Sequence, residues 1–83
     1  MNNNNNFRII KESISQKKER KDKNNNDYLI LELDNKETLF VFPPKVNEER
    51  WNWLEVGKSY NFTVEEGKKG GNLLVDFEIE INV

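Results

Sequence analysis

The chain of 83 residues contains no cysteine and no histidine. Without cysteine it can form neither a disulfide nor a thiol nucleophile, and without either residue it lacks the usual ligands of zinc sites. The absence of histidine also removes the side chain that most often performs acid–base catalysis near neutral pH. No recognisable set of nucleophile and acid–base groups is left, so we expect a protein without catalytic activity, cofactor or metal.

The sequence also lacks an apolar run of about 18 residues that could cross a membrane, and it does not begin with a secretory signal. Together with the absence of cysteine, this predicts a cytoplasmic protein that contacts no membrane. Residues 2–6 are all asparagine, and we expect residues 1–6 to be disordered. Residues 7–83 should form a single domain with a small core.

Two short runs rich in aliphatic and aromatic residues, 28–33 and 38–42, are separated by Asp34-Asn35-Lys36-Glu37. This pattern is typical of a β-hairpin. Successive side chains of a strand point to opposite faces, and here both rows are largely apolar. We therefore expect one row to face a core and the other row to face a binding partner.

The register of this hairpin decides which row faces out. A three-residue corner pairs Leu31 with Leu39 and Ile30 with Phe40, whereas a two-residue corner pairs Leu31 with Phe40 and turns both phenylalanines inward. We favour the first register, because an interior of leucine and valine fits a narrow barrel better. The outward row then consists of Tyr28, Ile30, Phe40 and Phe42.

The segment before the hairpin divides into two parts. Residues 7–15 are rich in β-branched side chains with imperfect alternation, which predicts a first strand that contains a bulge. Residues 16–27 include no apolar residue at all. A helix in this segment would have no face to bury, so we expect a long exposed loop.

The segment after the hairpin predicts one helix. Asn47 is a good N-cap, two glutamates follow it, and Gly57 lies where a helix-ending glycine belongs, so we place a helix over residues 48–55. Trp51 and Trp53 are two positions apart and cannot both face inward. We expect Trp51 to close the end of the core and Trp53 to be half exposed.

Two alternating segments complete the chain. Residues 59–65 and 73–83 both alternate between apolar and polar side chains, and the turn between them, residues 66–72, contains three of the four glycines. Both segments are therefore predicted to be strands. The inward row of the last strand is expected to comprise Leu73, Val75, Phe77, Ile79, Ile81 and Val83.

The predicted order is strand, long loop, strand, tight corner, strand, helix, strand, glycine-rich turn, strand. This order, together with the stretch Leu-Glu-Val-Gly-Lys-Ser-Tyr-Asn-Phe at 54–62, resembles the OB-fold nucleic-acid-binding superfamily over residues 7–83. The resemblance implies a mostly β fold, a small five-stranded OB-like Greek-key barrel with one short helix between strands 3 and 4. An SH3-like barrel is the structural alternative, but it lacks an eight-residue helix before the fourth strand.

The resemblance also implies a ligand site over strands 2 and 3, between the loops that join strands 1–2 and 4–5. In this chain those loops are residues 16–27 and 66–72, and both carry basic residues. We therefore predict non-catalytic binding of single-stranded DNA or RNA, with the loops attracting phosphates and the outward hairpin row stacking on bases. The predicted interface comprises Lys17, Lys18, Arg20, Lys21, Lys23, Tyr28, Ile30, Phe40, Phe42, Lys68 and Lys69.

Exposed apolar surface marks partners of any kind, so the alternative function is a protein–protein interaction subunit of a larger assembly that uses the same face. The formal net charge of −2 indicates modest affinity for nucleic acid. No motif indicates a small-molecule substrate, and the glycine-rich turn lacks the spacing and the following helix of a phosphate-binding loop. The row Asp76, Glu78 and Glu80 is expected to be a solvated face rather than a metal or catalytic site.

Overall fold

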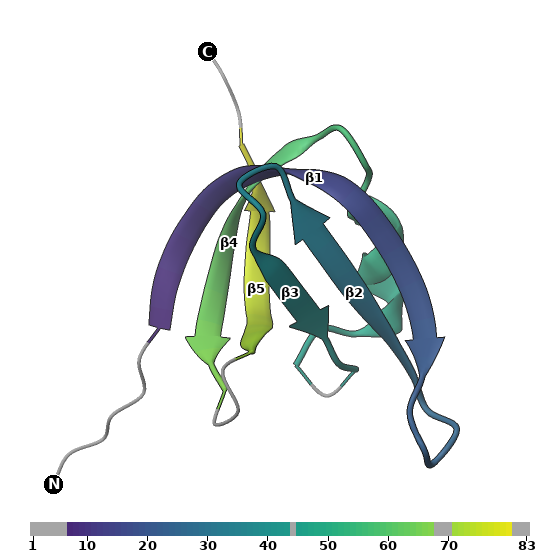
Figure 1. The fold of residues 1–83 in the computed structure, drawn as a ribbon. Helices are drawn as coiled ribbons and strands as arrows, with labels where there is room; N and C mark the ends of the chain where they lie inside the picture. The colour runs from purple at the N-terminus through teal and green to yellow at the C-terminus, as the bar shows by residue number, and fades with distance from the viewer. Residues whose placement is uncertain (1–6, 44, 68–70, 81–83) are drawn as a thin grey trace, which may run out of the picture.

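The computed structural model describes residues 7–43, 45–67 and 71–80. The expected disorder of residues 1–6 therefore lies outside the described residues. No helix in this part of the chain is long and apolar enough to span a membrane. Its elements are β1 (Phe7–Lys21), β2 (Asp27–Leu33), β3 (Thr38–Val41), the 3-10 helix η1 (Glu48–Trp53), β4 (Ser59–Glu66) and β5 (Asn72–Ile79) (Figure 1).

The fold is mostly β, as predicted, and its strands pair in the closed order β1-β2-β3-β5-β4. β1 makes this closure possible, because its first half pairs with β4 and its second half pairs with β2. The register shifts between Ile14 and Gln16, and a bulge of this kind bends a strand. Figure 1 shows β1 arching over the sheet from one side to the other.

The structure contradicts the long exposed loop predicted over residues 16–27. β1 continues to Lys21, and each residue from Gln16 to Lys21 pairs with one residue of β2. The turn that remains spans only residues 22–26. Residues 16–21 form a strand without apolar side chains because their backbone hydrogen bonds to β2, which itself supplies the buried row.

Lys17 lies on the inner side of β1 and links this strand to η1. Its ammonium group donates to the carbonyl oxygens of Trp51 at 2.8 Å and Leu54 at 2.9 Å. These carbonyls lie at the end of η1, where a cation is favourable because the last carbonyls of a helix lack partners within it. Lys17 therefore does not occupy the exposed loop in which the sequence analysis placed it.

The hairpin has the register of the three-residue corner. Ile30 pairs with Phe40 and Leu31 pairs with Leu39. The inward leucines and valine of both strands are buried, so the prediction of a Leu/Val interior is confirmed. At the corner the amide of Leu33 donates to the carbonyl of Glu37 at 2.9 Å, and Lys36 has a positive φ of 77°.

The predicted helix is present but is a 3-10 helix of six residues. Asn47 makes no side-chain cap hydrogen bond, and Gly57, with φ of 93°, donates its amide to the carbonyl of Ile14 rather than ending the helix. A short 3-10 helix suffices because Lys17 of β1 fixes its C-terminal end. Trp51 is buried and Trp53 is 57% exposed, as predicted.

The inward row predicted for the last strand is only partly correct. The pairing of β4 with β5 contains a bulge that leaves Val75 between two registered pairs. The alternation therefore switches at Val75, so that Leu74 and Phe77 are buried while Leu73 is half-buried. Ile79 is 55% exposed. The remaining two predicted inward residues, Ile81 and Val83, lie outside the described residues.

We expect Lys17→Met to lower the free energy of unfolding by about 1–2 kcal/mol, because two carbonyls lose a charged donor while the aliphatic stem is retained. Urea denaturation measures this loss. Lys23→Met is the matched control, since Lys23 is exposed in the β1–β2 turn, and it should change stability by less than about 0.5 kcal/mol. Equal stability of both variants would show that the lysine cap contributes nothing.

We expect Lys36→Gly to raise the free energy of unfolding by up to about 1 kcal/mol, because a positive φ strains any side chain with a Cβ. Asn35→Gly is the control at the neighbouring position. Asn35 bonds Glu37 through its side chain, so its replacement should lower stability. Thermal unfolding of the two variants compares them directly, and destabilisation by Lys36→Gly would contradict the observed corner.

Candidate nucleic-acid interface

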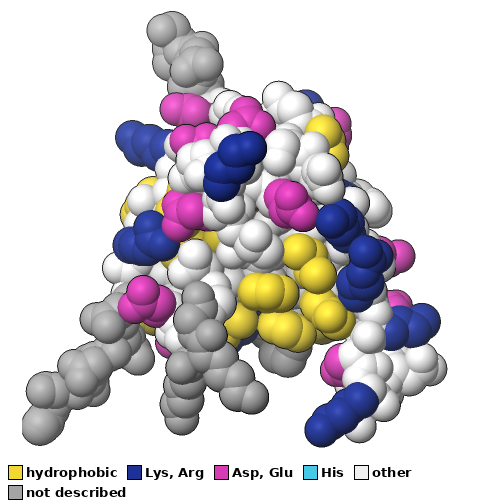
Figure 2. Space-filling model, in the orientation of Figure 1, with side chains coloured by type: hydrophobic (Ala, Val, Ile, Leu, Met, Phe, Trp, Pro, Cys, Tyr) yellow, Lys and Arg dark blue, Asp and Glu magenta, His cyan; other side chains and the backbone are white. Residues whose placement is uncertain are grey.

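The outer face of the β2–β3 hairpin carries four large apolar side chains, Tyr28, Ile30, Phe40 and Phe42, which we call the hairpin platform. Each is half-buried, because neighbours in the sheet flank it on the sides. The rings of Tyr28 and Phe42 are stacked, with centroids 5.2 Å apart and an angle of 23° between their planes. Figure 2 shows apolar side chains gathered on this face of the molecule.

Phe40 lies at the centre of the platform. It pairs with Ile30 on one side and with Leu73 of β5 on the other. Its ring packs against Gly71, where an added Cβ would come within 3.1 Å of Phe40 Cε2. Gly71 in turn accepts a hydrogen bond of 2.6 Å from the amide of Gly67. The ends of the β4–β5 turn therefore meet beside the platform.

Two of the predicted cations, Lys18 and Arg20, lie on the platform's face of the sheet. Lys18 is the β1 partner of Ile30, and Arg20 is the partner of Tyr28. Arg20 is exposed, whereas the ammonium of Lys18 lies 3.0 Å from a carboxylate oxygen of Glu32. Both side chains of this ion pair are partly exposed to solvent, so the pair is weak and Lys18 can readily bind another anion in place of Glu32. Figure 2 shows lysine and arginine side chains along the edge of the apolar area.

The other predicted cations are placed differently. Lys21 lies 2.6 Å from the Asp27 carboxylate, and this hydrogen bond raises the pKa of the Lys21 ammonium. Lys23 is exposed in the β1–β2 turn, and Lys17 bonds the end of η1. The structure thus brings together only part of the predicted basic set. Lys68 and Lys69 lie between Gly67 and Gly71 in the sequence, outside the described residues.

The turn between β1 and β2 is organised by Asp22. Its Oδ1 accepts hydrogen bonds from the amide of Asn24 at 2.8 Å and the amide of Asn26 at 2.9 Å. These bonds favour the charged carboxylate, and the bond from Asn26 contributes most to lowering the pKa of Asp22. Asn25, between them, has a positive φ of 67°. The turn therefore fixes where the second half of β1 begins to pair with β2.

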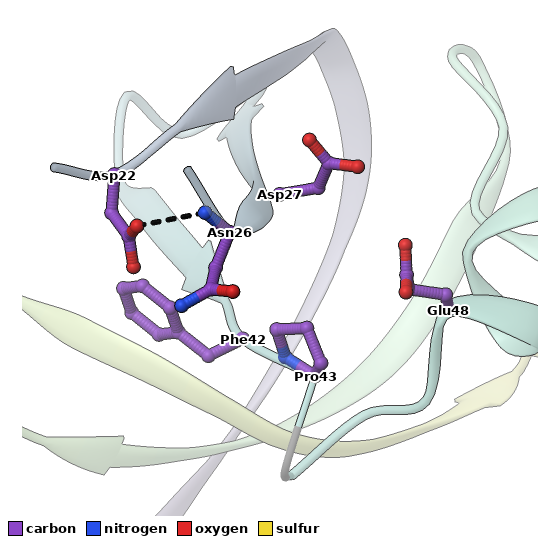
Figure 3. A pocket seen from close by; sticks show the side chains of 6 residues that line it. All are labelled: Asp22, Asn26, Asp27, Phe42, Pro43 and Glu48. Carbon is purple, nitrogen blue, oxygen red and sulfur yellow. Dashed lines mark hydrogen bonds between the residues drawn. The ribbon is translucent and has the colours of Figure 1, made fainter. Parts of the chain in front are cut away.

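A hollow of about 560 Å³ borders the platform at Phe42. Its carboxylates come from the β1–β2 turn, the first residue of β2 and the start of η1, so its negative charge disfavours phosphate. The hollow leaves no signal in the sequence, because the segments that line it are distant in the chain. In the described part of the chain, no group of three or more acidic residues is arranged to hold a metal ion. The lining residues, drawn in Figure 3, are Asp22, Asn26, Asp27, Phe42, Pro43 and Glu48.

Comparison with models of known protein families gives no match for this chain, and comparison with curated proteins gives none either. Its function is therefore inferred from the platform and the charges around it.

We expect the carboxyl group of Asp22 to titrate below the ordinary aspartate range. A lowered pKa in the folded state means that the stabilisation is present above the unfolded pKa and is lost as the pH falls through the folded pKa. The β1–β2 turn should therefore loosen only in strongly acidic solution. Carbon-detected NMR follows the carboxyl group, and the amide protons of Asn24 and Asn26 should shift with the same midpoint.

Asp22→Ala is the control for this titration, because it should abolish the acid-dependent shift of both amide protons. An ordinary aspartate pKa in the unmodified chain would contradict the two hydrogen bonds.

Proposed function

We propose that this chain binds single-stranded nucleic acid, without catalysis, on the hairpin platform and the cations beside it. The observation that carries this proposal is the register of β1 with β2, which sets Lys18 beside Ile30 and Arg20 beside Tyr28. Neighbouring strands lie about 4.8 Å apart, so a cation stands one strand away from the apolar row. A base can then stack on a ring while its phosphate meets a cation.

The platform suits stacking without strong base preference. Its aromatic members are Tyr28, Phe40 and Phe42, and each is partly exposed on a rigid pair of strands. Stacking of a base on an aromatic side chain is worth about 1–3 kcal/mol, and every base has a face that can stack. The platform therefore supports binding to oligonucleotides of either sugar type, DNA or RNA.

We further propose that the closed sheet is an OB-like Greek-key barrel. Support comes from the strand order β1-β2-β3-β5-β4 and from the position of η1 between β3 and β4. In such barrels nucleic acid lies over strands 2 and 3, which are the strands that form the platform. The fold proposal and the binding proposal therefore agree on the same face.

The charge of the site points to modest affinity. Among the described residues of the predicted basic set, only Lys18 and Arg20 pair directly with platform residues. Each phosphate neutralised on a single strand contributes about −0.7 to the slope of log affinity against log salt. Two contacts give a slope of about −1.4, so a fourfold rise in salt should weaken binding by about sevenfold. Lys23, Lys68 and Lys69 would steepen this slope if they also reach phosphates.

Titration of labelled oligo-dT and oligo-U at 50 and 200 mM salt tests this proposal. Phe40→Ala should weaken binding by about fivefold or more, since a stacked base is worth about 1–3 kcal/mol. Phe7→Ala is the matched control, because Phe7 is 51% exposed on the outer face of β1 next to β4. It should change affinity by less than twofold.

A second pair of variants separates charge from stacking. Arg20→Gln should weaken binding and reduce the salt slope by about 0.7, whereas Lys11→Gln, exposed on the first half of β1, should do neither. Failure of both oligonucleotides to bind at low salt would refute the proposal. A protein partner that binds the platform equally well at both salt concentrations would favour the alternative, an interaction subunit.

A further inference from the structure

A second exposed apolar surface lies between η1 and the end of β5, away from the platform strands. Trp53 is 57% exposed and Ile79 is 55% exposed. Together with Arg50, Phe77 and Glu78 they line an open groove of about 470 Å³, which we call the η1–β5 groove. Tryptophan and arginine are among the residues most enriched at the centres of protein interfaces.

We propose that the η1–β5 groove binds a segment of another protein that presents one large apolar side chain flanked by lysine or arginine. The apolar side chain of the partner would fill the groove between Trp53 and Ile79. Its basic neighbours would meet the carboxylates around the groove. This interface is separate from the proposed nucleic-acid site, so either can be wrong without the other.

The groove is held in shape by bonds to the backbone of η1. The carbonyl of Trp53 accepts a hydrogen bond of 2.5 Å from the Tyr60 hydroxyl, which also accepts a 2.8 Å bond from the amide of Glu55. Lys17 fixes the carbonyls of Trp51 and Leu54 on either side. The exposed indole therefore stands on a fixed backbone, which lowers the entropic cost of binding.

The charges around the groove select a basic partner. Arg50 lies 2.9 Å from the Asp76 carboxylate, and its guanidinium stacks over the Phe77 ring at 4.5 Å, so its charge is already engaged. No ion pair of the described residues involves Glu49, Glu78 or Glu80. Arg50, Asp76 and Glu78 together carry a formal charge of −1 at the groove, and the carboxylate of Glu78 is the one left to bind a cation. A carboxylate at the edge of the groove attracts lysine and arginine and repels phosphate.

A second copy of this chain fits the groove less well. Two grooves placed face to face would bring the Glu78 carboxylates together, and like charges are unfavourable at an interface. The hairpin platform of a second copy is apolar and has cations beside it, but its docking in the groove would be heterologous and would generate rings or open chains. A separate basic partner complements the charge of the groove. It avoids both the repulsion between Glu78 carboxylates and heterologous assembly.

The test uses three labelled heptapeptides with the full chain. The first is Gly-Lys-Arg-Leu-Lys-Arg-Gly, the second replaces its leucine with serine, and the third replaces its four basic residues with glutamate. We expect the first to bind at least tenfold more tightly than the other two. Its binding should shift the Trp53 indole N–H and the Ile79 methyl signals in NMR spectra.

Variants of the chain complete the test. Trp53→Ser and Glu78→Lys should each weaken binding of the first peptide by about tenfold, while Phe40→Ala, on the platform, should leave it unchanged. Equal binding of the glutamate peptide, or shifts confined to the platform, would overturn the proposal. The proposal would also be overturned if the mass of the protein in solution rose with its concentration and Trp53→Ser restored the monomer mass. That result would identify a second copy of the chain as the occupant.

Discussion

The structure depends on a single bent strand that pairs along both of its halves. β1 joins β4 before the bulge and β2 after it, and without this bend the sheet could not close. Ile14, next to the bulge, is 1% exposed, and its backbone exchanges hydrogen bonds with Gly57 and Lys58. The connection after η1 therefore holds the bend in place. The same bend carries the second half of β1 to the edge of the platform.

Alternation along that half of β1 gives neighbouring lysines opposite roles. Lys17 points inward and caps η1, whereas Lys18 points outward beside Ile30. Both side chains have the same chemistry, so their difference comes only from the face of the strand on which each lies. The stability of η1 and the charge of the platform thus depend on the same short stretch of strand. A shift of one residue in the register would exchange the two roles.

Alternation of side chains predicts the hairpin correctly but misleads in β5, and residues 16–21 show none. The hairpin register followed from its Leu/Val row, and the exposure of Trp53 followed from its spacing to Trp51. Residues 16–21 show no apolar period, so their pairing with β2 left no signal in the sequence. The bulge at Val75 was equally hidden, because a bulge reverses alternation without changing composition. The η1–β5 groove joins residues far apart in the chain, which only the closed sheet brings together.

The net charge of this chain does not describe its two exposed apolar surfaces, because the charges beside them differ in sign. Charges act over about 8 Å at physiological ionic strength, so each surface is governed by its own neighbours rather than by the total of −2. Lys18 and Arg20 stand one strand from the platform, whereas the η1–β5 groove is lined by Glu78 and by Arg50, whose charge is engaged by Asp76. Because the aromatic side chains at both places are partly exposed, the local charge decides which partner each can accept. We therefore propose a polyanion as the partner of the first surface and a basic segment as the partner of the second.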